Sequence, residues 1–143
     1  MRTPNPAIQK LNEGYACVVQ KPDGGLACAE GIGVKPLMAF LREDGRFFEG
    51  AAVADKVVGK AAALLLVKGG VREVYGRVMS EAAMAVFRRF GIPYSFETAV
   101  PFIQNRAGDG ICPLEDAVST IGEPEEAFPA LEARIAELMA NRG

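Results

Sequence analysis

The sequence predicts a soluble, single-domain α/β protein, and three observations predict that class. The 143 residues match the length of one typical domain. Half of them are hydrophobic, which is enough for a packed core and is not typical of disordered chains. Short apolar runs bounded by glycine and proline alternate with segments of helical periodicity, as in layered proteins. We expect one domain over 1–143, with its core at about 6–127 and a C-terminal helix at about 124–141.

The first third of the chain is expected to form a β-hairpin between two short helices. Lys21-Pro22-Asp23-Gly24-Gly25 has the proline and glycines of a hairpin turn, and apolar runs flank it. Gly31 and Gly33 interrupt the chain before the second helix. The segment 47–50 fits either a loop or a brief strand. The elements expected here are a helix at 6–11, strands at 15–20 and 26–30, and a helix at 35–42.

The segment 54–67 is expected to form one helix at the centre of the fold. Its second half, 61–67, is apolar on every face, so it should be buried on all sides. Its first half is polar and includes Asp55, an acid that is favourable near a helix N-terminus. Lys68-Gly69-Gly70 ends the helix. The helix would therefore begin at the solvent and end inside the core.

The remaining chain alternates between strands and helices. Ser80 is a good N-cap, and Gly91 has the place of the C′ residue of the same helix. In the strand that follows, Tyr94 and Phe96 would share one face. The alternation favours a layered sandwich with parallel strand pairs after the hairpin. The elements expected here are a strand at 71–78, a helix after Ser80, a strand at 93–98, a helix opening at Pro113, and a final helix over 124–140 that Pro129 resets.

Composition excludes several classes of function. The net charge of −2 and the pI near 5.3 give no general attraction for nucleic acid or membrane surfaces. The longest apolar stretch, 61–67, is too short to span a bilayer, and the N-terminus has no apolar core of a signal peptide, so a cytoplasmic location is expected. The absence of histidine excludes Ser-His-Asp triads and zinc sites with a histidine ligand. Cys17, Cys28 and Cys112 indicate no disulfide framework, and we expect no metal and no cofactor.

Asp55, Lys56 and Lys60 form the first candidate site, at the start of the predicted central helix. A lysine in the first turns of an exposed helix is disfavoured by about 0.3–1 kcal/mol. Lys56 and Lys60 would also share one helical face as like charges. Beside free backbone N–H groups such a pair makes an anion or phosphate site, although both could be solvated surface lysines. Gly59, inside this helix, indicates the close approach of another part of the chain or of a ligand.

Cys112 marks the second candidate site. It precedes Pro113 and is therefore expected to be an N-cap, with Glu115 in the position of a capping-box residue. The helix dipole would favour a reactive thiolate there, and Glu115 would oppose it. The alternative is a small buried residue that holds the loop in place. Upstream, Asn105 and Arg106 with two glycines would form a phosphate-gripping loop, although the Gly-Lys-Ser/Thr ending of a P-loop is missing.

Three runs of the sequence together resemble the domain-of-unknown-function family 1893. They are Gly33-Val34-Lys35-Pro36-Leu37, Val53-Ala54-Asp55-Lys56-Val57-Val58-Gly59-Lys60-Ala61-Ala62-Ala63 and Cys112-Pro113-Leu114-Glu115. The resemblance covers most of the chain, from the first hairpin to about Ala127. It implies a cytidine deaminase-like fold, which is a three-layer α/β/α sandwich whose mixed sheet has helices on both faces.

The resemblance also implies where a pocket lies and which chemistry is missing. Zinc deaminases of that superfamily begin the corresponding helix with His-x-Glu or Cys-x-Glu, and a later helix with Pro-Cys-x-x-Cys. In this sequence these places fall on 55–57 and 79–84, which contain no histidine or cysteine. Deamination by a zinc hydroxide is therefore not expected. The superfamily's pocket would be surrounded by Asp55, Lys56, Ser80 and Glu81, with Lys60 one turn deeper.

These residues support three functional hypotheses. The first is a metal-free enzyme or nucleotide-binding protein in which Asp55, Lys56 and Cys112 are catalytic. The second is a non-catalytic sensor or interaction module that keeps the pocket. The third is a sulfur carrier that uses Cys112, because formate dehydrogenase accessory sulfurtransferases resemble deaminases in fold. The predicted ligand-binding residues are Lys60, Ser80, Glu81, Asn105 and Arg106.

The expected partner is a small-molecule or nucleotide-like ligand. We expect no nucleic acid and no membrane as partners. Exposed strand edges and the apolar C-terminal helix would support a homodimer.

Overall fold

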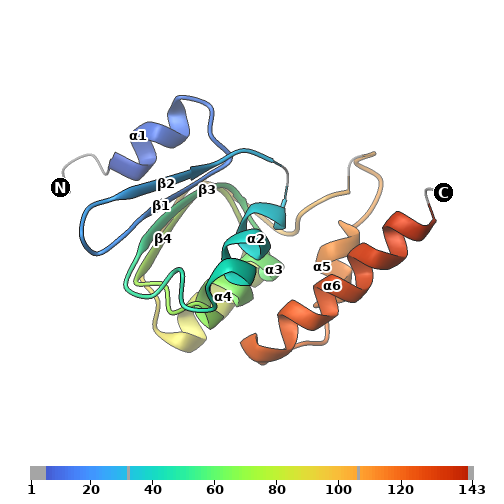
Figure 1. The fold of residues 1–143 in the computed structure, drawn as a ribbon. Helices are drawn as coiled ribbons and strands as arrows, with labels where there is room; N and C mark the ends of the chain where they lie inside the picture. The colour runs from blue at the N-terminus through green and yellow to red at the C-terminus, as the bar shows by residue number, and fades with distance from the viewer. Residues whose placement is uncertain (1–5, 32, 106, 142–143) are drawn as a thin grey trace.

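Strands and helices alternate in the computed structural model, which describes residues 6–31, 33–105 and 107–141. The strands are β1 (Cys17–Gln20), β2 (Leu26–Ala29), β3 (Ala52–Val58), β4 (Glu73–Ser80) and β5 (Tyr94–Val100). The helices are α1 (Pro6–Asn12), α2 (Lys35–Glu43), α3 (Lys60–Lys68), α4 (Glu81–Phe90), α5 (Pro113–Ala117) and α6 (Pro124–Ala140). The strands form one sheet in the order β2-β1-β3-β4-β5. In Figure 1, α1 lies on one face of this sheet and the other helices lie on the opposite face.

The sheet is mixed, as the sequence predicts. β1 pairs antiparallel with both β2 and β3, whereas β3–β4 and β4–β5 are parallel pairs. The predicted turn joins β1 to β2, and the Lys21 N–H donates to the Gly25 carbonyl oxygen at 2.8 Å. The hairpin, the parallel pairs after it and the α/β class are therefore confirmed. Among the described residues, α1 alone forms the layer on its face of the sheet.

The central segment differs from the prediction, because 52–58 is a strand and not the beginning of a helix. β3 pairs with β1 on one side and with β4 on the other. Val53, Val57 and Val58 are β-branched residues that fit a paired strand. Gly59 is the N-cap of α3 and has an extended backbone, so the helix begins only at Lys60. Asp55 and Lys56 consequently do not lie at a helix start, which corrects the first candidate site.

α3 forms the centre of the core, as its apolar composition predicts. Its residues from Ala61 to Leu66 are all buried. Side chains from α2, α4 and α6 pack around it, including Leu37, Phe87 and Leu131, each at 0% exposure. On the opposite face of the sheet, α1 makes a smaller cluster in which Ala7 and Leu11 lie with Val18 and Ala54.

The other helices follow their sequence signals. Ser80 caps α4, because its Oγ accepts from the Ala83 N–H at 3.1 Å, and Gly91 ends this helix with a left-handed φ of 71°. α6 spans the predicted residues, and Pro129 lies inside it without ending it. The segment 47–50 forms turns and not a strand. No helix in the described part of the chain is long and apolar enough to cross a membrane.

Candidate functional site

The start of α3, predicted to bind an anion, is occupied by a side chain of the protein itself. The Glu115 carboxylate accepts from the Lys60 N–H through Oε1 at 2.7 Å and from the Ala61 N–H through Oε2 at 2.8 Å. These are the N–H groups that a bound phosphate would use at a helix N-terminus. Glu115 therefore caps α3 and not α5, so the predicted capping box with Cys112 is wrong: Cys112 is the N-cap of α5 but makes no side-chain cap bond.

The two lysines of the predicted anion site do not form a pair on one helical face. Lys56 lies on β3, where its Nζ donates to the Gly14 carbonyl oxygen at 3.2 Å. Lys60 lies on α3, where its Nζ donates to the Ser119 carbonyl oxygen at 3.2 Å. Lys56 and Lys60 are four residues apart, and such residues share a face only when both belong to one continuous helix. The change from strand to helix at Gly59 removes that geometry.

Gly59 has a specific steric reason to be glycine. A methyl group at this position would lie 2.6 Å from the carboxyl carbon of Glu115 and 2.8 Å from its Oε2. The sequence indicated a close approach at Gly59, and the group that approaches is the capping carboxylate.

We expect Gly59→Ala to lower the free energy of unfolding by about 2 kcal/mol, because the methyl group displaces Glu115 and leaves two N–H groups without their acceptor. Urea unfolding measures the effect. Gly45→Ala is the matched control, since nothing lies within 4 Å of an added methyl group there. Equal stability of the two variants would contradict the contact.

Asp55 is a buried acid in the central strand. Asp55 is opposite Cys17 in the pairing of β3 with β1, and it is 5% exposed. Its carboxylate accepts from the Val57 N–H at 3.3 Å. Burial raises the pKa of Asp55 to about 7, and the N–H groups of Val57 and Lys56 with the Cys17 thiol act against this rise. Burial, and then the proximity of Asp55, raises the pKa of Cys17 well above its usual value. The pair is an acid and a thiol that both favour their protonated forms inside the core.

Of the remaining predicted site residues, Ser80 and Asn105 have structural partners. Ser80 is fully buried in its capping role, whereas Glu81 is exposed in the first turn of α4. Asn105 organises its own loop, because its Oδ1 accepts from the N–H groups of Gly108 and Asp109 at 2.8 and 3.2 Å. Its Nδ2 also donates to the Asp109 carboxylate at 2.9 Å. Arg106 lies outside the described residues.

Cys112 stands apart from the other residues that were predicted to be catalytic. It is partly exposed, and its backbone N–H donates to the Ile103 carbonyl oxygen at 3.0 Å. In the described part of the chain, no hydrogen bond joins Cys112 to Asp55 or Lys56. Within the same ranges, no group of three histidine, cysteine, aspartate or glutamate side chains could hold a metal ion.

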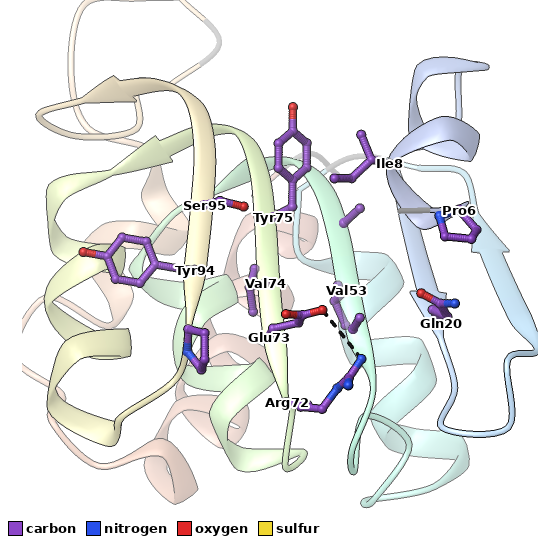
Figure 2. A pocket seen from close by; sticks show the side chains of 13 residues that line it. Pro6, Ile8, Gln20, Val53, Arg72, Glu73, Val74, Tyr75, Tyr94 and Ser95 are labelled. Carbon is purple, nitrogen blue, oxygen red and sulfur yellow. Dashed lines mark ion pairs between the residues drawn. The ribbon is translucent and has the colours of Figure 1, made fainter. Parts of the chain in front are cut away.

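A hollow lies on the α1 face of the sheet, and the sequence did not indicate it. Its volume is about 720 Å³. Figure 2 shows the side chains that line it. α1 forms one side through Pro6 and Ile8, and the sheet provides the rest at the amino ends of β3, β4 and β5. The hollow lies beside α1, which packs mainly against β1 and β3, and it extends over the amino ends of β4 and β5. The floor includes Ala52, Ala54 and Ser95.

The polar groups of this hollow lie around its edges. Arg72 and Glu73 form an ion pair, with Nη2 at 3.6 Å from Oε1. Gln20 and Ser95 face the hollow from opposite sides in Figure 2. The Tyr75 hydroxyl donates to Glu97 at 3.4 Å, and burial followed by the charge of Glu97 raises the pKa of Tyr75.

A second, smaller hollow of about 320 Å³ lies at the carboxyl ends of β3, β4 and β5. It is lined by Val57, Val78, Val100, Pro101, Phe102, Ile103 and Gln104. Ligands of open α/β sheets commonly bind beyond the carboxyl ends of the strands. This hollow, however, has one polar side chain, that of Gln104. None of the described residues that were predicted as site residues lines either hollow.

The comparisons with known proteins assign the family. The family model described as TM1506, domain of unknown function (DUF1893), matches residues 7–135. The chain belongs to the DUF1893 family. A solved structure of a DUF1893 family protein (TM1506) from Thermotoga maritima has 23% sequence identity and a TM-score of 0.78, and the match covers 93% of this chain and 92% of that chain. No curated protein matches the chain.

Membership confirms the family inferred from the sequence, and at this identity the DUF1893 structure shows a shared fold alone. Neither finding names an activity. The sequence did not predict the hollow, because part of its floor belongs to β3, a strand that was predicted as the start of a helix. The alternation of alanine with valine and aspartate in Ala52-Val53-Ala54-Asp55 was the available signal, since it places small residues on one face of a strand.

Proposed function

We propose that the protein binds a small, neutral heteroaromatic molecule, about the size of a nucleoside, in the hollow beside α1. The hollow carries this proposal, because its volume of about 720 Å³ lies within the range of about 300–1,000 Å³ that is usual for small-molecule sites. Tyr75, Pro93 and Ser95 supply the more exposed part of the lining, against which a flat ring can lie, whereas Ala52 and Ala54 are almost fully buried. Ile8 on α1 supplies an apolar wall.

The charge of the lining favours a neutral ligand over a phosphate. Arg72 is the basic residue of the lining and Glu73 is the acidic one, and the two form an ion pair. Their charges cancel, so the hollow offers no net attraction for an anion. This proposal replaces the anionic ligand that the two lysines suggested in the sequence.

The hydrogen-bonding groups favour a ligand with polar atoms on two edges. The Gln20 amide and the Ser95 hydroxyl can each donate and accept, and they lie on opposite sides of the hollow. A nucleobase has donors and acceptors around a flat ring, which suits this separation.

We also infer that the fold is a branch of the cytidine deaminase-like superfamily. The support is the order β2-β1-β3-β4-β5 together with two helices, α3 and α4, that directly follow β3 and β4. The first residues of these helices are Lys60-Ala61-Ala62 and Glu81-Ala82-Ala83, which contain no zinc-ligating thiol or imidazole. The branch would therefore bind a ligand without the zinc chemistry of the deaminases.

Catalysis by Asp55, Lys56 and Cys112 is not part of this proposal. Asp55 faces the core and lies outside the lining of the hollow. The sulfur-carrier role of Cys112 likewise gains no support from its contacts. A binding protein is the function that agrees with the described side chains.

Thermal unfolding with added nucleosides tests the proposal. A nucleoside at about tenfold excess over its Kd is expected to raise Tm by about 4 °C. Ser95→Trp is expected to abolish this rise, because the indole fills the hollow. Ala99→Trp is the matched control, since it lies on the same strand outside the lining and should keep the rise.

Two results would contradict the proposed site. One is an equal rise in both tryptophan variants, and the other is the absence of any rise with adenosine, guanosine, cytidine or uridine. A larger rise with the 5′-monophosphates than with the nucleosides would contradict the preference for a neutral ligand.

A further inference from the structure

β5 is an open edge of the sheet. It is the last strand in the order and, in the described ranges, pairs only with β4. Figure 2 shows it at the outer side of the sheet, as the strand that carries Tyr94 and Ser95. Its five central residues, 95–99, are all exposed. It contains neither the lysine nor the proline with which proteins protect a free edge, so it is available for pairing with another strand.

The register identifies which backbone groups point outward. The Val74 N–H donates to the Pro93 carbonyl oxygen at 3.1 Å, so the odd-numbered residues of β5 direct their backbone groups towards β4. The pairing continues in the same register to Val100. Phe96, Thr98 and Val100 therefore direct their N–H and C=O groups to the open edge.

α4 presents a matching stripe beside this edge. Glu81, Ala85 and Arg88 are exposed and lie on one helical face, at positions i, i+4 and i+7. The Arg88 guanidinium donates to the Tyr94 hydroxyl at 2.9 Å, which places this face of the helix on the side of β5. The stripe has an acid at one end, a base at the other and a small residue between them.

The midpoint of the stripe and the centre of the edge lie at about the same level. Ser80, where α4 begins, is paired with Val100. Ala85 lies five helical residues from Ser80, or about 7.5 Å at 1.5 Å per residue. Thr98 lies two strand residues from Val100, or about 6.6 Å at 3.3 Å per residue. A two-fold axis through Thr98 would therefore pass close to Ala85.

We propose that two copies of the chain form a dimer in which β5 pairs antiparallel with β5 of the second copy, about a two-fold axis at Thr98. Phe96 of each copy then lies opposite Val100 of the other, which covers an aromatic side chain that is 41% exposed. Each α4 packs against both β4 and β5, so about two strand spacings of 4.8 Å separate the two helices, which places them about 10 Å apart, a usual helix-packing distance. Glu81 of each helix meets Arg88 of the other, and Ala85 allows the close approach.

The position of Glu97 favours this register over the neighbouring one, in which the axis would pass through Glu97. With the axis at Thr98, Glu97 lies opposite Ala99 of the second copy. With the axis at Glu97, the two Glu97 carboxylates would lie directly opposite each other, which is destabilising. The strand pattern thus excludes the axis at Glu97, and the helix stripe favours the axis at Thr98. The inference does not depend on the proposed ligand.

Sedimentation equilibrium of the full chain tests the dimer, whose mass would be about 30 kDa, twice 15.2 kDa. Glu81→Arg and Arg88→Glu are each expected to raise the dimer Kd by about tenfold or more, because each places like charges across the axis. The double variant, with both charges exchanged, is expected to restore a Kd near that of the original chain. Restoration separates the proposed contact from a local effect on α4.

A second variant tests the strand pairing. Thr98→Pro removes an N–H group that faces the open edge and not β4, so it should prevent the dimer and leave the monomer folded by circular dichroism. A chain that is monomeric at all concentrations up to about 0.5 mM would overturn the proposal. So would a dimer that persists in Thr98→Pro, or a charge exchange that does not restore it.

Discussion

Asp55→Asn is expected to remove a large pH dependence from the stability of the protein. Burial raises the pKa of Asp55 from 3.8 to about 7 in the folded chain, whereas the unfolded chain keeps the ordinary value. The folded state therefore holds a proton that the unfolded state has released between these two pH values. This contribution is fully present below about pH 4 and is lost as the pH rises to about 7.

The size of this loss follows from the shift. A rise of about 3 pKa units, at about 1.4 kcal/mol per unit, corresponds to about 4 kcal/mol of stability between pH 4 and pH 7. We therefore expect the free energy of unfolding of the original chain to fall by about 4 kcal/mol between pH 4 and pH 7, relative to that of Asp55→Asn. Urea unfolding at pH 4.5, 6 and 7.5 measures the difference, which isolates Asp55 from other titrating groups.

Asp23→Asn serves as the control for this measurement. Asp23 lies exposed in the β1–β2 turn, so the substitution makes the same change of acid to amide outside the core. If the free energies of unfolding of the original chain and Asp55→Asn differ by the same amount from pH 4.5 to 7.5, the raised pKa of Asp55 is refuted. A difference of opposite sign would indicate that the folded protein favours the charged carboxylate.

Glu115→Ala is expected to lower the free energy of unfolding by about 3 kcal/mol. The carboxylate makes two charge-assisted hydrogen bonds to the N–H groups of Lys60 and Ala61, at the positive end of the helix that forms the core. Alanine leaves both N–H groups without an acceptor, in a partly buried place. Urea unfolding at pH 7.5 measures the loss.

Asp116→Ala is the matched control, because it lies on the same short helix. Its ion pair with Arg134, at 3.1 Å, involves a carboxylate that is 63% exposed, and such a pair contributes about 0–1 kcal/mol. Gly59→Ala acts on the same contact as Glu115→Ala, so the two losses should not add in the double variant. Additive losses, or a loss at Glu115 no larger than that at Asp116, would contradict the capping role.

The sequence was sufficient for elements whose signals are local. The hairpin turn has its proline and glycines between two apolar runs, and α4 has a serine cap at one end and Gly91 at the other. These signals act within a few residues, where backbone preferences decide the structure. The apolar run of α3 likewise predicted its burial, since no exposed face was available.

The central strand could not be distinguished from a helix by local pattern. The run from Ala52 to Val58 is short and largely apolar, and such runs fit either structure. Its conformation depends on pairing with β1 and β4, which are distant in sequence. That single difference moved Asp55 and Lys56 from a helix start into the sheet and separated Lys56 from Lys60.

The candidate site depended even more on distant contacts. Glu115 reaches the N-terminus of α3 from 55 residues away, and a sequence pattern with a span of a few residues does not indicate such a contact. The hollow depends on which strands α1 covers, and this is a property of packing between layers. The sequence therefore led to the start of α3, where the structure has a structural contact, and not to the exposed face of the sheet.

An NMR titration tests the central claim most directly, because amide signals report all the candidate sites at once. The account predicts that a nucleoside, added to the labelled chain, shifts the amide signals of Gln20, Tyr75 and Ser95, and that inorganic phosphate leaves those of Lys60 and Ala61 unchanged. Shifts of the Lys60 and Ala61 signals, or of the Val57 and Phe102 signals, would contradict the account. So would the absence of any shift with all four nucleosides.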